Sequence, residues 1–193
     1  MNTLQTIWSA LTVQNEELFN TISAPLNYLD AYIGMLFFST ILNINASTQR
    51  KILYVLVYGT FGVLINLFVP SSYVVFINIL LWPVIILFTL KTTILKSILS
   101  EVIVLVVTSI LDFFFAYIML NGFYITSEMI MTVPLYRLIV ILSIYLIIFV
   151  LAKIINALKI NIDIFDNMNI KTKVLLIVNA ILIILVLAMQ FFL

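Results

Sequence analysis

The sequence predicts an all-α, polytopic membrane protein with six transmembrane helices in a bundle and an amphipathic helix at the N-terminus. Of the 193 residues, 65% are hydrophobic and only 9% are charged. This composition provides more apolar surface than one soluble core can bury, so most of it is expected to face lipid. Six apolar stretches are each long enough to span a bilayer, which requires roughly 20 residues. We expect residues 1–193 to form a single membrane domain.

Residues 1–22 form the predicted amphipathic helix. They lack the cationic start of a cleavable signal peptide, and Glu16 and Glu17 stand where such a peptide is apolar. Apolar residues recur at helical spacing with polar residues between them, namely Leu4, Ile7, Trp8, Leu11 and Leu18. This pattern suits a helix lying in the membrane interface, or an ordinary helix packed over the bundle.

The six predicted spans follow one another with short polar gaps between them. Their boundaries are 25–43, 52–69, 73–90, 97–120, 133–158 and 174–193. Pro25 and Pro134 suit the first turn of a helix, where the missing backbone N–H is no loss, so each is expected to mark a helix start. Pro70, Ser71 and Ser72 predict a tight hairpin in which the serines are available as caps.

The cationic residues predict the orientation of the chain. Eight of the nine lie in three alternate gaps or, for Lys153, near the end of the span before the third gap: Arg50, Lys51, Lys91, Lys96, Lys153, Lys159, Lys171 and Lys173. Short loops rich in Lys and Arg remain on the cytoplasmic side of a membrane. The N-terminus is therefore expected to be extracellular, and six spans also bring Leu193 to the outside.

Besides Lys153, three acidic residues and one arginine fall inside the predicted spans, where such groups are costly and usually paired or functional. Glu101 and Asp112 are separated by three helical turns plus about 20°, so they share one helix face with Thr108. Asp30, Asp112 and Arg137 are the candidates for an external ligand-binding site. The alternative is that they form structural ion pairs, or that Arg137 extends to the membrane interface.

Three further polar residues are candidates for structural or relay roles. Glu101 belongs to the cytoplasmic half of its span and is separate from the external candidates in this interpretation. Asn66 and Asn78 flank the hairpin, and hydrogen bonding between helices is favoured for them over ligand contact. Gly59 and Gly62 predict a site of close helix packing.

A proline in the third span predicts a local distortion. Pro83 follows Trp82 in this span, and a proline removes one backbone hydrogen bond, so a kink is expected there.

Composition and motifs argue against an enzyme. The chain contains neither cysteine nor histidine, which removes thiol nucleophiles, imidazole bases and the usual soft metal sites. No glycine-rich phosphate loop, metal-ligand cluster or nucleophile beside a base can be recognised. We therefore expect no catalytic residue, no metal, no cofactor and no nucleic-acid partner.

Four segments resemble the N-terminal membrane region of GHKL-type sensor histidine kinases, which are clostridial relatives of the accessory gene regulator peptide receptors. The segments are LQTIWSAL (4–11), KTTILKSILSE (91–101), VPLYR (133–137) and DNMNIKTKVLLIVN (166–179). The resemblance covers essentially the whole chain but concerns packing and loop patterns. It implies a bacterial plasma-membrane sensor, in a possible homodimer, that binds an extracellular peptide or small-molecule signal and relays it to a cytoplasmic histidine kinase domain.

This chain departs from that family in lacking the phosphoacceptor histidine and the nucleotide-binding motifs. The predicted topology would also need one more span before a cytoplasmic kinase domain could begin. The alternative function is a small transporter subunit, such as a vitamin-binding component of an energy-coupling uptake system. The charge pattern disfavours that alternative, because those proteins resemble a bundle with both termini inside.

Overall fold

The computed structural model describes residues 3–13, 16–159, 169 and 172. The described chain is helical and contains no strand, which confirms the all-α class. Its helices are α1 (Thr3–Thr12), α2 (Glu16–Ile41), α3 (Thr48–Phe68), α4 (Ser71–Leu90), α5 (Ile94–Phe123), α6 (Ser127–Thr132) and α7 (Pro134–Ala157). Five long helices thus occupy the first five predicted spans. The sixth, 174–193, lies outside the described residues.

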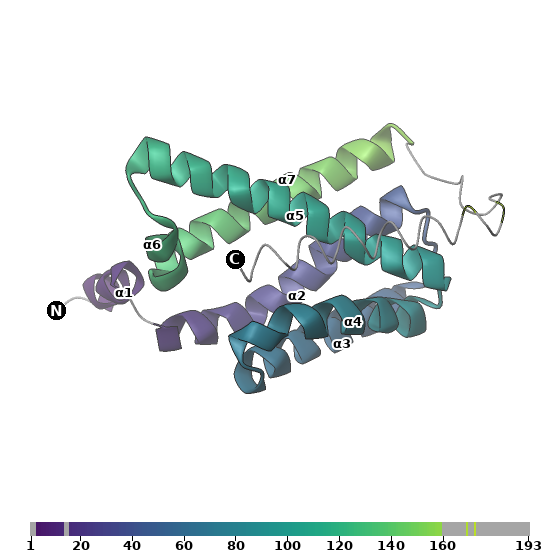
Figure 1. Ribbon diagram of the computed structural model, residues 1–193, viewed down its shortest axis with the longest axis horizontal. Coiled ribbons are helices and arrows are strands. Elements are labelled where there is room, and N and C mark those ends of the chain that lie inside the picture. The colour runs from purple at the N-terminus through teal and green to yellow at the C-terminus, as the bar shows by residue number, and fades with distance from the viewer. Residues whose placement is uncertain (1–2, 14–15, 160–168, 170–171, 173–193) are drawn as a thin grey trace.

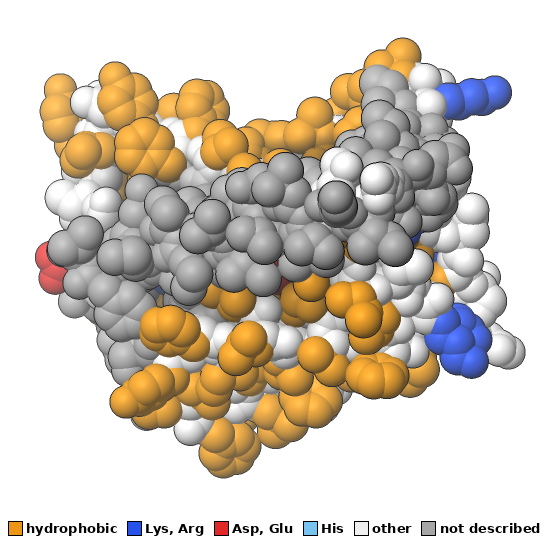
Figure 2. Space-filling model, turned by 45° about the vertical axis from the view of Figure 1, so that its right-hand side comes forward, with side chains coloured by type: hydrophobic (Ala, Val, Ile, Leu, Met, Phe, Trp, Pro, Cys, Tyr) orange, Lys and Arg blue, Asp and Glu red, His pale blue; other side chains and the backbone are white. Residues whose placement is uncertain are grey.

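Three of the described helices, α3, α5 and α7, are long and apolar enough to cross a membrane, and Phe76–Leu90 in α4 forms a shorter apolar helix. Large hydrophobic side chains are exposed along their outer surfaces, for example Leu67, Phe113 and Leu146, each at 63% or more. Figure 2 shows hydrophobic side chains spread over the visible face. Such a surface suits lipid and not water.

The long helices alternate in direction (Figure 1). Helix α2 packs against α3, α5 and α7, while α4 lies between α3 and α5. Because of this alternation, the start of α3, the junction of α4 with α5 and the end of α7 lie at the same end of the bundle. The cationic residues of these segments, Arg50, Lys51, Lys91, Lys96, Lys153 and Lys159, therefore gather there, and we call this the basic end.

The N-terminal region differs from the predicted single helix over residues 1–22. Helix α1 ends at Thr12, whose hydroxyl donates to the carbonyl of Trp8, and α2 begins at Glu16. Pro25 lies inside α2, so the prediction that it marks a helix start was wrong. Acidic residues stabilise a helix N-terminus through its dipole, and the pair Glu16 and Glu17 provides that signal before the proline.

The other proline prediction is confirmed, because Pro134 occupies the first turn of α7. The hairpin between α3 and α4 is also tight, but its cap differs from the expected serines. Pro70 itself is the N-cap residue of α4, and Ser71 is already helical. The predicted external loop 121–132 is largely helical, since α5 continues to Phe123 and α6 follows after three residues.

Helix α2 is the centre of the packing. One buried cluster joins it to α3 and α4 through Phe38, Tyr54 and Ile86, and a second joins it to α7 through Phe37 and Ile144. Two glycines allow α3 to approach α2 closely, because they have no Cβ atom. A Cβ atom added at Gly59 would meet the Tyr28 ring, and one added at Gly62 would meet Asn27. The predicted close-packing site is thereby confirmed.

Candidate functional site

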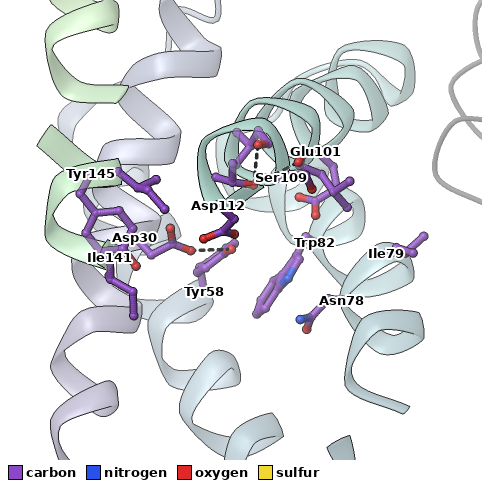
Figure 3. Close-up of a pocket in the computed structure, with 14 residues that line it drawn as sticks. Asp30, Tyr58, Asn78, Ile79, Trp82, Glu101, Ser109, Asp112, Ile141 and Tyr145 are labelled. Carbon is purple, nitrogen blue, oxygen red and sulfur yellow. Dashed lines mark hydrogen bonds between the residues drawn. The ribbon is translucent and has the colours of Figure 1, made fainter. Parts of the chain in front are cut away.

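A cavity of about 330 Å³ lies inside the bundle, and all five long helices contribute to its wall. Asp30 comes from α2, Tyr58 from α3, Trp82 from α4, Glu101 from α5 and Tyr145 from α7. Figure 3 shows these side chains converging from opposite walls. The volume is at the lower end of the range for small-molecule sites, roughly 300–1,000 Å³. It therefore suits a small molecule or a single side chain.

Asp30 accepts a hydrogen bond from one tyrosine hydroxyl and lies near a second, each on a neighbouring helix. The Tyr58 hydroxyl donates to the Asp30 carboxylate at 3.1 Å, and the Tyr145 hydroxyl lies within hydrogen-bonding reach of it. A carboxylate in an apolar bundle requires such donors, because lipid supplies none. Asp30 thereby joins α2 to α3 and α7 at the cavity wall.

An aromatic wall continues from Tyr58. Its ring stacks on Trp82 with the centroids 3.9 Å apart and the planes inclined by 20°. On its other side Tyr58 contacts Tyr54, whose ring meets Phe38 edge to face at 5.9 Å. This row of rings leads from the cavity into the buried core, so the position of Tyr58 is fixed from both sides.

Three carboxylates share the cavity. Glu101 and Asp112 lie on the same face of α5 with Thr108, which confirms the polar stripe predicted from their spacing. Asp112 and Glu101 each interact electrostatically with Asp30, because like charges close together repel one another. Figure 3 shows Asp112, Asp30 and Tyr58 directed toward one another. The cavity is therefore rich in carboxyl groups, and we call it the acidic cavity.

Two buried acceptors in this cavity lack a donor among the described residues. Glu101 is 8% exposed, and the described part of the chain supplies it with neither a hydrogen bond nor an ion pair. The Asn78 Oδ1 atom is buried and has no hydrogen-bond partner there either. An unsatisfied buried acceptor costs about 1–3 kcal/mol, and more when it is charged, so native structures contain few of them.

The structure regroups the residues predicted to bind ligand. Asp30 and Asp112 line the cavity together, and Glu101, which had been expected to be separate, lines it with them. Arg137 is not part of the wall, but it is close enough to Asp112 for electrostatic attraction. Asn66 is exposed on α3 and outside the cavity.

Asn78 differs from its predicted role as well. Asn78 lines the cavity, but its buried side-chain oxygen accepts no hydrogen bond from another helix among the described residues. The expectation of interhelical hydrogen bonding is therefore wrong for this atom.

Sequence analysis missed the aromatic part of the site. Tyr58 and Tyr145 received no role, and Trp82 was considered only for the kink beside Pro83. A usable signal was present, since a tyrosine hydroxyl in the middle of an apolar span must find a partner within the bundle. The partner, Asp30, could have been inferred only from knowledge of the neighbouring helices.

A second cavity, of about 340 Å³, opens at the basic end. Asn43 and Asn45 after α2, Lys51 in α3, and Asn156 and Lys159 at the end of α7 contribute to its lining. The two cavities thus differ in character, because the first is lined by carboxyl and aromatic side chains and the second by amides and lysines. Among the described residues, no group of three or more metal-ligating side chains is arranged to hold a metal ion.

Comparison of the chain with protein-family models, with curated proteins and with solved structures gave no match.

Proposed function

We propose that this chain is the signal-input domain of a bacterial membrane sensor that works with a cytoplasmic histidine kinase domain. In this proposal the chain crosses the plasma membrane six times with its N-terminus outside. The signal is an extracellular peptide or small molecule. The observation that carries the proposal is the cavity to which all five long described helices contribute, because a ligand bound there contacts every one of them.

A ligand acts as a signal only when it prefers one of two helix arrangements. The cavity supplies the elements for such a preference, since Asp30 is bonded to Tyr58 on α3 and lies within reach of Tyr145 on α7. A ligand that competes for the Asp30 carboxylate would change how α2 packs against α3 and α7. The ends of these helices carry the change to the basic end, where a kinase domain of this or another chain would receive it.

The alternative is a transporter subunit. Substrate sites of transporters commonly lie near the bilayer midplane between helices, and this cavity lies about midway along α2, α5 and α7. The two functions differ in an observable way, because a transporter moves its ligand across the membrane and a sensor does not.

The test uses donor and acceptor fluorophores on the substitutions Ser47→Cys and Ala157→Cys, two exposed positions at the basic end. The native chain has no cysteine, so labelling is specific. The labelled protein is reconstituted in liposomes and treated with the small-molecule and peptide fraction of medium conditioned by the producing bacterium. A sensor should show a saturable change in energy transfer without uptake of material into the liposomes.

A matched pair of variants locates the response. Ser109→Phe places a ring in the cavity, whereas Ile110→Phe adds the same ring at a neighbouring position that is 63% exposed. We expect Ser109→Phe to abolish the change in energy transfer and Ile110→Phe to retain it. Uptake that depends on Ser109 would establish the transporter instead, and a response unchanged by Ser109→Phe would place the ligand elsewhere.

A further inference from the structure

We infer that the ligand of the acidic cavity is an organic cation, an ammonium or guanidinium group presented by a small molecule or by a basic peptide side chain. This inference rests on the proposed function in taking the cavity as a ligand site. It adds the chemical class of the ligand.

The first step is the charge of the wall. Asp30, Glu101 and Asp112 face one space, and electrostatic interactions connect Asp30 to both of the others. No Lys or Arg is among the described residues that line it. Arg137 influences Asp112 from outside the wall, which leaves Asp30 and Glu101 facing the cavity without a cation in its lining. A cationic ligand would convert mutual repulsion into attraction.

The second step is the pattern of hydrogen-bonding atoms. Glu101 is more than nine-tenths buried and the Asn78 Oδ1 atom is fully enclosed, and both lack donors in the described structure. A ligand that supplies an N–H or O–H group at the wall would satisfy the Glu101 carboxylate. Ammonium and guanidinium groups are donors without any acceptor, which matches this requirement.

The third step is the aromatic surface between these acceptors. The stacked rings of Tyr58 and Trp82 line the same cavity, and an aromatic face attracts a cation within about 6 Å. An inorganic ion would gain little from such a wall. The combination of rings, carboxylates and a volume of about 330 Å³ favours an organic cation that carries an apolar portion.

The fluorescence of a native tryptophan can report binding in the cavity. It has two tryptophans, and only Trp82 lies in the cavity. The variant Trp8→Phe therefore leaves a single fluorophore at the proposed site. This protein, in lipid nanodiscs, is titrated with phenethylammonium and with acetyl-lysine methylamide, which represent the two sources of the cation. The matched controls are phenylacetate and acetyl-norleucine methylamide.

We expect Trp82 fluorescence to change saturably with one or both cations, and not with the matched controls at the same concentrations. A response to phenethylammonium alone would indicate a small-molecule amine, and a response to the lysine derivative would indicate a basic peptide side chain. Asp30→Asn and Glu101→Gln should each weaken binding about thirtyfold or more, as expected for loss of a buried charge partner. Glu128→Gln, which removes an exposed carboxylate on α6, should leave binding unchanged.

The unfolding temperature of each variant, measured without ligand, distinguishes loss of binding from loss of the fold. Because Glu101 repels Asp30 and has no donor in the described structure, Glu101→Gln should unfold at the same or a higher temperature than the parent without ligand. It should lose only the stabilisation that the cation provides. Cation binding retained in both Asp30→Asn and Glu101→Gln would overturn the inference. Equal binding of the uncharged control, or the same response to sodium chloride alone, would overturn it as well.

The outcomes also separate this inference from the proposed function. If conditioned medium changes energy transfer at the basic end while neither cation competes with it, the sensor stands and the ligand is not cationic. If the cations bind as described but energy transfer never changes, the site is established and the sensor proposal fails.

Discussion

Substitution of Gly59 by alanine tests the packing that positions the cavity wall. A Cβ atom at this position would lie 2.2 Å from Cδ1 of Tyr28 and 2.6 Å from two further ring atoms. Ordinary contact begins at 3.4 Å, so the ring would have to move by about 1 Å. That movement would disturb the hydrogen bond of 3.1 Å between the hydroxyls of Tyr28 and Thr60. Overpacking of this kind typically costs about 1–3 kcal/mol.

The matched control is Gly122→Ala in α5, where an added Cβ atom meets nothing within 4 Å. Replacing a helical glycine by alanine favours the helix by up to about 1 kcal/mol at either position, so this contribution largely cancels in the comparison. Gly59→Ala should therefore be about 1–3 kcal/mol less stable than Gly122→Ala. For a chain of this size the difference corresponds to roughly 2–12 °C in Tm.

The other two glycines of the chain, Gly62 and Gly34, allow the stabilities of four alanine variants to be ranked. A Cβ atom at Gly62 would lie 3.0 Å from Oδ1 of Asn27, whereas one at Gly34 would make ordinary contact with Val104 at 3.8 Å. Gly62→Ala should fall between Gly122→Ala and Gly59→Ala, and Gly34→Ala should match the control. The assay is thermal unfolding in detergent followed by circular dichroism. Equal Tm values for Gly59→Ala and Gly122→Ala would refute the close contact of α3 with α2.

Three further predictions concern topology, charge and enzymatic activity. Single cysteines at Ser47 and Thr92 should be shielded from an impermeant thiol reagent in intact cells, while those at Ser72 and Thr126 should react; the opposite labelling would invert the orientation. Asp112→Asn and Arg137→Gln should together lose less thermal stability than the sum of the single variants, because each single variant removes the same attraction between the two groups, and strict additivity would exclude their interaction. Because the sequence contains no kinase motif, the purified chain should neither hydrolyse ATP nor take up phosphate from it. Labelling of the chain by radioactive ATP would contradict this prediction.

The positions of the long helices were predictable from the sequence because lipid leaves the backbone no alternative. Apolar segments must satisfy their hydrogen bonds internally, so each of the first five predicted spans is helical. The start of α2 was not predicted, since Pro25 was read as a first-turn residue although Glu16 and Glu17 precede it with a stronger start signal. A proline is tolerated inside a membrane helix, where its position does not define the boundary.

Part of the site followed from periodicity, and the rest depended on which helices are neighbours. The spacing of Glu101 and Asp112 is a property of one helix, and the structure places both in one cavity. The meeting of Asp30 with Tyr58 requires α2 beside α3, and the stack of Tyr58 on Trp82 requires α4 beside α3. Adjacent spans of similar hydrophobicity can pack in many ways, because lipid solvates their outer faces equally well.

Three helices, α2, α3 and α7, contribute residues to both cavities, and α2 and α7 connect them as follows. Near its middle α2 provides Asp30 to the acidic cavity, and beyond its end Asn43 lines the cavity at the basic end. Helix α7 provides Tyr145 to the first and Asn156 to the second, about 16 Å further along its axis. A buried cluster containing Ile144 and Ile148 packs these two helices together between the cavities.

Because α2 and α7 pack together between the two cavities, a ligand in the first cavity could alter the second. Tight packing between α2 and α7 resists gradual deformation, so a shift at the junction of Asp30 with Tyr145 would move both helices as units toward a second packing. The basic end would then change shape without any direct contact with the ligand. A conservative test is Ile148→Val, which removes one methyl group between the cavities. If the helices act as units, this variant should retain cation binding at Trp82 and weaken the change in energy transfer at the basic end. Loss of both responses together would show instead that Ile148 supports only the acidic cavity.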